Sequence, residues 1–390
     1  MGKVKLKRGE EKRIKAGHLW IFNNEIDKIL DLKENGEIVE VLDHKGNFVA
    51  KGYYNKHSLI SVRILTSDLN QDIDKNFLKE KMTKAYQYRQ NIYPRLSSYR
   101  VVYSEGDLLP GLIVDKYENF LSLQILTLGM EKLKIFILEV LEELFQPEGV
   151  VLKNDSVFRE MEGLKKEITI VKGNFDAHQI IEEYGLKFYV DLLKGQKTGF
   201  FFDQRENRGL TASVSKNRKV LDCFCYTGGF ALVAAKGGAK EVLGVDESES
   251  AVKLAQENAK LNNFNKVTFQ KQEVFNFLRK LNSAGEKFDM VILDPPAFVK
   301  SKEKLKEGIK GYKEINLQAM KLLNSGGILI SCSCSYQFSK EDFLNMIKKA
   351  ATDSGKKFRL IKELTQAADH PILLSMPETQ YLKGVILEVL

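Results

Sequence analysis

The chain of 390 residues predicts an α/β protein whose C-terminal half is a doubly wound parallel sheet, preceded by a small β-barrel and a central α+β domain. Two observations predict the parallel sheet. Strand-like and helix-like segments alternate from about residue 183 onward. Two apolar runs, VILDPPAF at 291–298 and ILISCSCS at 328–335, also break abruptly into rigid or reactive residues. Such runs are typical of buried parallel strands, whose carboxyl ends meet at a ligand crevice.

More than one domain is expected, because the chain exceeds the length at which a single hydrophobic core usually stops growing. Residues 1–70 contain short strands separated by Gly and Asn turns, such as GEIVEVLD and GNFVAKGYYN, and these predict the barrel. Residues 71–182 begin with a polar helical segment that stops at Pro94 and continue with strands and one amphipathic helix. Residues 183–390 form the third predicted domain, which carries the alternation of strands and helices.

The charge balance favours a polyanionic partner. Sixty Lys and Arg against fifty-two Asp and Glu give a formal net charge of +8. No apolar run approaches the roughly 20 residues that cross a bilayer. The basic start MGKVKLKRGEEKRIKAGHLWIF lacks the apolar core of a signal peptide. We therefore expect a cytoplasmic protein without a membrane partner.

The four cysteines form two Cys-x-Cys pairs, Cys223 with Cys225 and Cys332 with Cys334. Their spacing matches none of the usual zinc patterns, and a structural disulfide is not expected in the cytosol. Both pairs end apolar strands and could approach each other in space, so a metal or redox role stays open as the less favoured alternative. We predict no bound metal.

A cofactor turn is predicted at Thr227-Gly228-Gly229, directly after an apolar strand. Asp246 ends the next strand about twenty residues later, where a carboxylate accepts bonds from ribose hydroxyls. The turn is not G-x-G-x-x-G, which disfavours NAD and favours S-adenosylmethionine, a cofactor with a ribose and no phosphate. An ordinary strand-to-helix turn is the alternative. The rigid Asp-Pro-Pro at 294–296 shifts the balance toward a cofactor site.

These motifs and others resemble those of the PUA-containing large-subunit rRNA 5-methylcytosine methyltransferases, and the resemblance covers nearly the whole chain. It implies an RNA-binding PUA barrel, a central α+β domain, and a Rossmann-like class I methyltransferase domain that uses S-adenosylmethionine. The implied partner is rRNA, specifically 23S rRNA. The segments that carry the resemblance are GHLWIFNNEI at 17–26, GYYNKHSLISVRILT at 52–66, SEGDLLPGLIVDKY at 104–117, KTGFFFDQRENR at 197–208, DCFCYTGGF at 222–230, DPPAFVKSK at 294–302, SCS at 333–335 and DHPILLSMPETQYLKG at 369–384.

The family's chemistry implies that Cys334 is the nucleophile. Carbon 5 of cytosine attacks a methyl group poorly, so a thiolate must first add to carbon 6. Asp294 is the candidate that hydrogen-bonds ring nitrogen 3 and stabilises the adduct. Cys332 lies on the same strand face by alternation and is more simply read as a small buried hydrophobe. Ala297 stands where several related enzymes have a second cysteine, which leaves the base for the carbon 5 proton unassigned.

The remaining candidates fall into two groups. The cofactor-binding candidates are Phe224, Tyr226, Thr227, Gly228, Gly229, Asp246, Glu273, Asp294 and Pro295. Glu273, which follows the third strand, is the candidate partner of the adenine amino group. The lysines among the substrate-binding candidates would neutralise phosphates and Phe298 would stack on an extruded base; plain solvated surface and core packing are the alternatives. The substrate-binding candidates are Lys197, Gln204, Arg205, Pro296, Phe298, Lys300 and Lys302.

Two other functions stay open at this point. One is methylation of a guanine or adenine nitrogen, which needs no cysteine nucleophile. The other is an RNA-binding or ribosome-assembly protein that has kept the fold and lost catalysis. The modified nucleotide, the form of the rRNA substrate and the oligomeric state are not determined by the sequence, and a homodimer is one of the alternatives.

Overall fold

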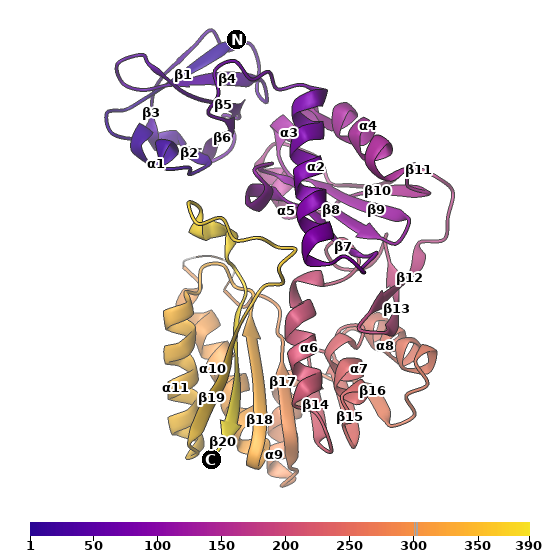
Figure 1. Cartoon of the computed structure of the whole chain (residues 1–390). Helices are drawn as coiled ribbons and strands as arrows, with labels where there is room; N and C mark the ends of the chain where they lie inside the picture. The colour runs from indigo at the N-terminus through magenta and orange to yellow at the C-terminus, as the bar shows by residue number, and fades with distance from the viewer. Residues whose placement is uncertain (300, 302) are drawn as a thin grey trace. The chain divides into compact units, whose positions relative to one another are not determined.

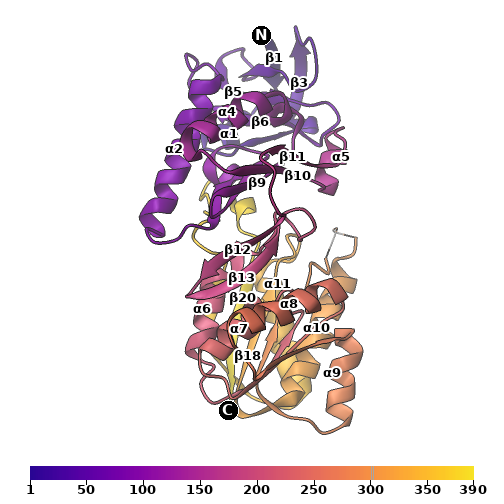
Figure 2. The same cartoon turned by 90° about the vertical axis from the view of Figure 1, so that its right-hand side faces the viewer.

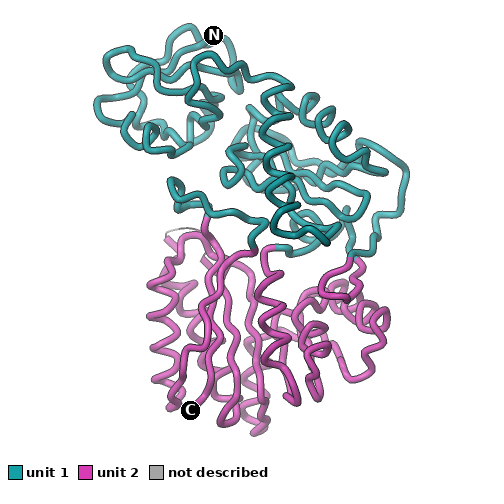
Figure 3. Tube along the Cα trace, viewed as in Figure 1, with its two compact units in different colours: residues 1–181, 190–202, 368–379 teal, residues 182–189, 203–367, 380–390 magenta. Residues whose placement is uncertain are grey.

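The computed structural model describes residues 1–299, 301 and 303–390, and the chain forms two compact units (Figure 3). Unit 1 consists of Met1–Ile181, Val190–Phe202 and Ala368–Thr379, and unit 2 of Glu182–Tyr189, Asp203–Ala367 and Gln380–Leu390. Unit 1 thus takes in nearly all of both predicted N-terminal domains, and unit 2 holds the predicted catalytic sheet.

Unit 1 begins with a six-stranded sheet in the order β2-β6-β5-β4-β1-β3. Its strands pair antiparallel except β1 with β4, which run parallel. Val4, Val39 and Val62 are fully buried in its core. The elements are β1 (Gly2–Leu6), α1 (Glu11–Lys15), β2 (Trp20–Phe22), η1 (Asn23–Glu25), β3 (Ile26–Leu30), β4 (Ile38–Leu42), β5 (Phe48–Tyr54) and β6 (Ile60–Thr66).

The second sheet of unit 1 has the order β11-β10-β9-β8-β7. The predicted polar segment is the helix α2, which starts where the Asp74 carboxylate accepts from Phe77 N and ends before Pro94. The predicted amphipathic helix is α4, which buries Ile137 and Val140. The elements are α2 (Lys75–Ile92), β7 (Tyr99–Tyr103), η2 (Ser104–Asp107), β8 (Leu112–Tyr117), β9 (Phe120–Ile125), α3 (Leu128–Lys132), α4 (Lys134–Phe145), β10 (Gly149–Asn154), α5 (Val157–Met161) and β11 (Glu167–Lys172).

Unit 2 contains a seven-stranded sheet in the order β16-β15-β14-β17-β18-β20-β19. The first five strands of this order run parallel, as predicted, and β20 runs antiparallel to both of its neighbours. A separate pair consists of β12 (His178–Glu183) and β13 (Leu186–Asp191). The strands of the large sheet are β14 (Lys219–Cys223), β15 (Glu241–Asp246), β16 (Val267–Lys271), β17 (Phe288–Leu293), β18 (Leu323–Ser333), β19 (Phe358–Thr365) and β20 (Lys383–Val389).

Helices cover both faces of this sheet (Figures 1 and 2). Helices α6, α7 and α8 pack along one face, and α9, α10 and α11 along the other, where they bury the main apolar core with β17 and β18. This arrangement follows from right-handed crossovers that start in opposite directions from β14. The helices of this part of the chain are η3 (Phe202–Gln204), α6 (Arg205–Ser213), α7 (Gly229–Lys236), α8 (Glu249–Leu261), α9 (Val274–Ser283), α10 (Leu305–Leu322) and α11 (Lys340–Ser354). The short helix η4 (Pro377–Thr379) belongs to unit 1.

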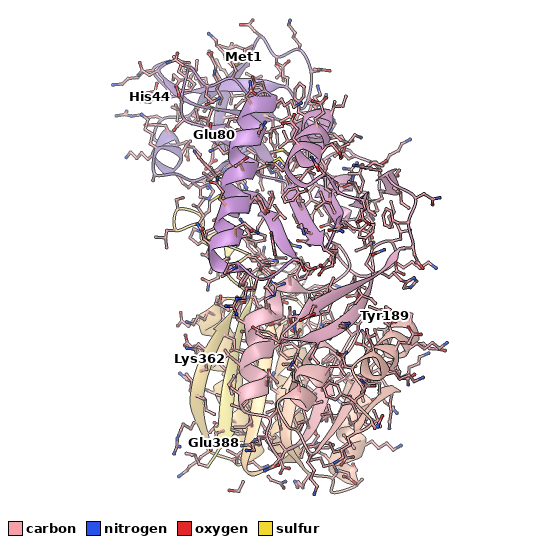
Figure 4. The ribbon with its side chains drawn as sticks, turned by 45° about the vertical axis from the view of Figure 1, so that its right-hand side comes forward. Met1, His44, Glu80, Tyr189, Lys362 and Glu388 are labelled. Carbon is pink, nitrogen blue, oxygen red and sulfur yellow. The ribbon has the colours of Figure 1, made fainter. Side chains whose placement is uncertain are left out.

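Strand register brings the predicted site residues to one edge of the sheet. Leu293 pairs with Cys223 on one side and with Ser331 on the other. The residues that follow these strands, including Asp294 and Cys334, therefore emerge at neighbouring positions. The antiparallel strands β19 and β20, marked by Lys362 and Glu388 in Figure 4, complete the sheet beyond β18.

Candidate active site at the carboxyl edge of the sheet

The turn after β14 has an unusual backbone. Phe224, Tyr226 and Gly228 adopt φ values of 64°, 47° and 87°, in the left-handed region. Non-glycine residues rarely accept this conformation, and such strain clusters at ligand sites. The turn is held by Tyr226 N, which donates to Asp246 Oδ2 at 2.9 Å, and by Asn258 Nδ2, which donates to the Thr227 carbonyl at 3.0 Å.

Asp246 ends β15 beside this turn. Besides Tyr226 N, it accepts a bond from Ser248 N at 2.9 Å through Oδ1. Each carboxylate oxygen can accept two hydrogen bonds, so these contacts leave acceptor capacity for a ligand hydroxyl. The predicted pairing of the glycine turn with Asp246 therefore exists as a direct contact in the structure.

Two buried oxygen atoms beside the turn suit a ligand with hydrogen-bond donors. Among the described residues, Asp222 Oδ1 and Thr227 Oγ1 are buried without a hydrogen-bond partner. Burial, and then the charges of Asp294 and Asp246, raise the pKa of Asp222 well above its usual range. An unsatisfied buried oxygen is costly unless a ligand pairs with it. An amino-acid ammonium and a ribose, as in S-adenosylmethionine, supply donors of the required kind, so the residues fit this cofactor.

Gly228 offers a test of the turn. A Cβ there would lie 2.9 Å from the Phe269 ring at φ +87°, whereas Gly238 has the same φ and its Cβ would meet only Lys216 at 3.6 Å. We expect Gly228→Ala to raise the dissociation constant for S-adenosylmethionine at least about tenfold, and Gly238→Ala to cost only about 1–2 kcal/mol of stability. Calorimetric titration and thermal unfolding of both variants check this. Equal affinities for the cofactor would contradict it.

Asp294 follows β17 and is held by a chain of side-chain amides. Gln204 Nε2 donates to Asp294 Oδ1 at 2.8 Å. Asn207 Nδ2 in turn donates to Gln204 Oε1 at 2.6 Å and to the Thr365 carbonyl at 3.0 Å. Gln204 and Asn207 are both buried. Because the nitrogen and the oxygen of the Gln204 side-chain amide each have a hydrogen-bond partner, the orientation of this amide is fixed, and the Asp294 carboxylate is fixed with it.

Cys334 lies just beyond the last residue of β18 and is half-buried, whereas the other three cysteines are buried. Its Sγ lies 3.9 Å from the Pro295 carbonyl, in the turn that carries Asp294. Cys332 lies within β18, opposite Gly384, and has no exposed surface. Burial raises the pKa of the Cys332 thiol well above its usual range. A thiol that is neutral and inaccessible is a poor nucleophile. The difference in burial therefore favours Cys334 over Cys332 as the nucleophile, a choice that the alternation of side chains along the strand does not make.

The structure engages several predicted ligand-binding residues in protein contacts. Arg205 Nε donates to Glu183 Oε2 at 3.1 Å, and Arg208 Nε donates to Glu183 Oε1 at 2.5 Å, all three residues being buried. This ion cluster favours a structural role for Arg205. Glu273 caps α9, where its carboxylate accepts from Phe275 N at 3.0 Å and Asn276 N at 2.9 Å. A contact between Glu273 and an adenine amino group stays a prediction.

The other substrate-binding candidates differ in their surroundings. Phe298 is half-buried against an aromatic cluster, with ring centroids 4.7 Å from Tyr312 and 5.7 Å from Phe275. Pro296 is exposed on the same turn. Lys197 belongs to unit 1, where its ammonium lies 4.5 Å from the centroid of the Phe201 ring. Lys300 and Lys302 fall outside the described residues.

Two contributors were missed from the sequence. Asp222 stands within the β14 strand, and the signal that could have found it is an acidic residue at an otherwise apolar strand end, six residues before Gly228. Lys383 opens β20 next to the Cys334 loop. It lies in the segment 369–384 that carries the resemblance, but its residue type alone does not distinguish it from a surface lysine. In the part of the chain that the structure describes, no group of three or more His, Cys, Asp or Glu could hold a metal ion. No described helix is long and apolar enough to cross a membrane.

Comparisons with known proteins agree with the fold and the cofactor. Residues 4–67 match the family model of a PUA-like domain, and residues 168–372 match that of an S-adenosylmethionine-dependent methyltransferase. The protein named Ribosomal RNA large subunit methyltransferase I from Tolumonas auensis is 40% identical, with 99% of each chain covered. The protein of the same name from Enterobacter sp. is 37% identical over 99% of this chain and 98% of its own length.

Solved structures show the same fold over the full length. A protein described as a SAM-dependent methyltransferase from Streptococcus mutans superposes with a TM-score of 0.86 at 19% identity, covering all of both chains. Another solved methyltransferase with the same TM-score is complexed with SAH. The predicted fold class and the predicted cofactor, S-adenosylmethionine, are both confirmed. The chain therefore belongs to the S-adenosylmethionine-dependent methyltransferase family, in the full-length group whose members are named Ribosomal RNA large subunit methyltransferase I.

Proposed function

We propose that this protein methylates carbon 5 of a cytosine in large-subunit (23S) rRNA, with Cys334 as the nucleophile. The names of the relatives support an rRNA substrate, and so do the PUA-like domain and the net charge of +8. One observation carries the choice of carbon over nitrogen. A half-buried thiol, Cys334, lies 3.9 Å from the carbonyl of Pro295, next to Asp294 at the cofactor edge of the sheet. Nitrogen methylation has no use for that thiol.

The cofactor would be held by the glycine turn, Asp246 and the unsatisfied oxygen of Asp222. When bound, S-adenosylmethionine supplies an electrophilic methyl group on a sulfonium. A ligand donor that pairs with Asp222 Oδ1 would remove the cost of that buried atom, whose carboxyl group already accepts from Ala231 N at 2.9 Å through Oδ2. Asp222 would in this way hold the amino-acid end of the cofactor.

Cys334 and Asp294 have separate roles in the proposed reaction. The Cys334 thiolate forms a bond to carbon 6, and the electron pair of the 5,6 double bond shifts to carbon 5, which becomes the methyl acceptor. Asp294, donating or accepting at ring nitrogen 3 and the adjacent amine, stabilises the charge that develops in the ring. Carbon 5 would take the methyl group as the methyl–sulfonium bond breaks, with that electron pair staying on the cofactor's sulfur. Transfer of the carbon 5 proton to water or another base then restores the 5,6 double bond, and the bond between carbon 6 and the Cys334 sulfur breaks with release of the thiolate.

The amide chain explains why the segment before α6 matters for catalysis. Gln204 and Asn207 hold Asp294 in one orientation, and catalytic groups must be held within a fraction of an ångström to be effective. We assign Gln204 to positioning Asp294. The predicted contact of Gln204 with RNA stays a prediction.

The proposed product is tested by incubating the enzyme with labelled S-adenosylmethionine and unmodified rRNA, followed by nucleoside mass spectrometry. We expect 5-methylcytosine at one position. A methylated guanine or adenine would contradict the product, and cofactor binding without methyl transfer would favour an RNA-binding protein that has lost catalysis. An rRNA substrate would also put the reaction in the cytoplasm. Mapping the label identifies the nucleotide.

A further inference from the structure

Lys383 is a buried lysine whose side chain ends at the loop that carries Cys334. It opens β20, which pairs antiparallel with β18 (Figure 1), and it stands opposite Ser333 in the ladder. Only 7% of the residue is exposed. Among the described residues no carboxylate lies within 4 Å of its amine. A buried amine without an acidic partner is costly and calls for another explanation.

The amine of Lys383 instead joins two points of the loop after Cys334. Nζ donates to the Ser335 carbonyl at 2.7 Å and to the Phe338 carbonyl at 2.6 Å. These carbonyls lie on either side of the turn that follows the thiol. The contacts therefore fix the path of the chain where Cys334 leaves the sheet, beyond the last strand hydrogen bonds.

The charge of Lys383 also acts on Cys334. Burial lowers the pKa of Lys383 to about 8, and the opposing influence is the charge of Cys334. The amine is therefore mostly protonated at neutral pH, where it favours the thiolate over the thiol. Tyr312 and Cys332 also interact with Cys334, but burial raises the pKa of both, so they are neutral at pH 7. The carboxylates of Asp294 and Asp203 act on the neighbouring Cys332 thiol, where they raise its pKa further.

We propose that Lys383 is a positioning residue for Cys334, which holds the loop that carries the thiol and stabilises the thiolate with a buried positive charge. The proposal rests on the proposed function of Cys334 as nucleophile. Lys383 would act through Cys334, because its amine contacts the loop that carries the thiol. The thiolate is the reactive form of cysteine, so loss of the Lys383 charge is expected to slow the reaction of Cys334 with an alkylating reagent.

The chain offers a matched control at the other end of β18. Lys356 Nζ likewise donates to main-chain carbonyls, those of Met320, Lys321 and Leu323, and burial likewise lowers its pKa. Replacing Lys356 removes a comparable set of hydrogen bonds from the end of α10 and the first residue of β18. It leaves the surroundings of Cys334 intact.

The test measures the alkylation of Cys334 in the full-length protein by iodoacetamide as a function of pH, quantified by peptide mass spectrometry. We expect Lys383→Met to raise the thiol pKa by about one unit and to slow alkylation at pH 7 about tenfold. Lys383→Arg, which keeps the charge, should retain the fast reaction, and Lys356→Met should match the wild-type profile. Circular dichroism and cofactor binding verify the fold. Lys383→Gln, which keeps an amide donor, substitutes if the methionine variant is unstable.

Two results would overturn the proposal: a wild-type profile in the folded Lys383→Met or Lys383→Gln protein, or an equal shift in Lys356→Met. The readout needs neither RNA nor cofactor. A failure of the covalent mechanism would appear separately, as full methyl transfer by a Cys334→Ala enzyme, and would leave the alkylation result unchanged.

Discussion

Replacement of Cys334 by alanine is expected to lower methyl transfer at least about 10³-fold, because no other accessible thiol can activate carbon 5. Cofactor affinity should stay within about twofold, since Cys334 is not part of the glycine turn or its Asp246 contact. The measurement is single-turnover transfer of labelled methyl groups to unmodified rRNA, with cofactor binding followed by calorimetry.

The matched control for this variant is Cys332→Ala, two residues earlier on the same strand. Cys332 is fully buried, so its removal should cost about 1 kcal/mol of stability and leave methyl transfer within about threefold. RNA containing 5-fluorocytosine gives a second readout, because fluorine at carbon 5 blocks release of the adduct. The wild-type protein should form a covalent complex that survives denaturing electrophoresis. If the complex were lost in Cys332→Ala and persisted in Cys334→Ala, Cys332 would be the nucleophile and the assignment of Cys334 would be wrong.

Replacement of Asp294 by alanine is expected to lower the rate of methyl transfer about 10²- to 10³-fold through loss of charge stabilisation in the ring. The free energy of unfolding should fall by about 1–3 kcal/mol, because the buried Gln204 amide loses its acceptor. Single-turnover rates at saturating RNA and cofactor check the prediction. A loss confined to cofactor affinity would instead assign Asp294 to the cofactor alone.

Asp289, at the opposite end of β17, is the control for Asp294. Its carboxylate accepts from Lys219 N at 2.9 Å and from Asn324 Nδ2 at 2.9 Å. Asp289→Ala removes the same charge from the same strand, so it should cost about 1 kcal/mol of stability and leave the rate unchanged. An equal loss of rate in both variants would mean that the effect of Asp294→Ala comes from disturbing β17.

The strand ends were predictable because they depend on local patterns. An apolar run followed by Asp-Pro-Pro marks the end of β17, and a glycine turn marks the passage from β14 to α7. Register within a parallel sheet then brings such ends together without further information. The contact between the Tyr226 amide and Asp246 follows from the same rule.

Local sequence patterns could not have shown that Gln204 contacts Asp294. Its partner Asp294 is 90 residues distant in the chain, and Arg205 meets Glu183 only because α6 packs beside β12. A polar residue in a sequence motif looks the same whether it faces a ligand or a buried side chain. Glu273 illustrates the point at short range, since capping α9 and binding adenine require the same residue type at the same place.

The sequence by itself determined the fold class, the cofactor turn and the cysteine pair that could supply a nucleophile, because periodicity, turn chemistry and residue type are local properties. The resemblance already favoured Cys334 over Cys332, but only the tertiary structure shows how their burial differs, since burial within the β18–β20 ladder and exposure just beyond it depend on where that pairing ends. The tertiary structure also revealed the buried Lys383, whose amine reaches the Cys334 loop from the neighbouring strand. Contacts of this kind join residues far apart in the chain, and their distances are set by packing.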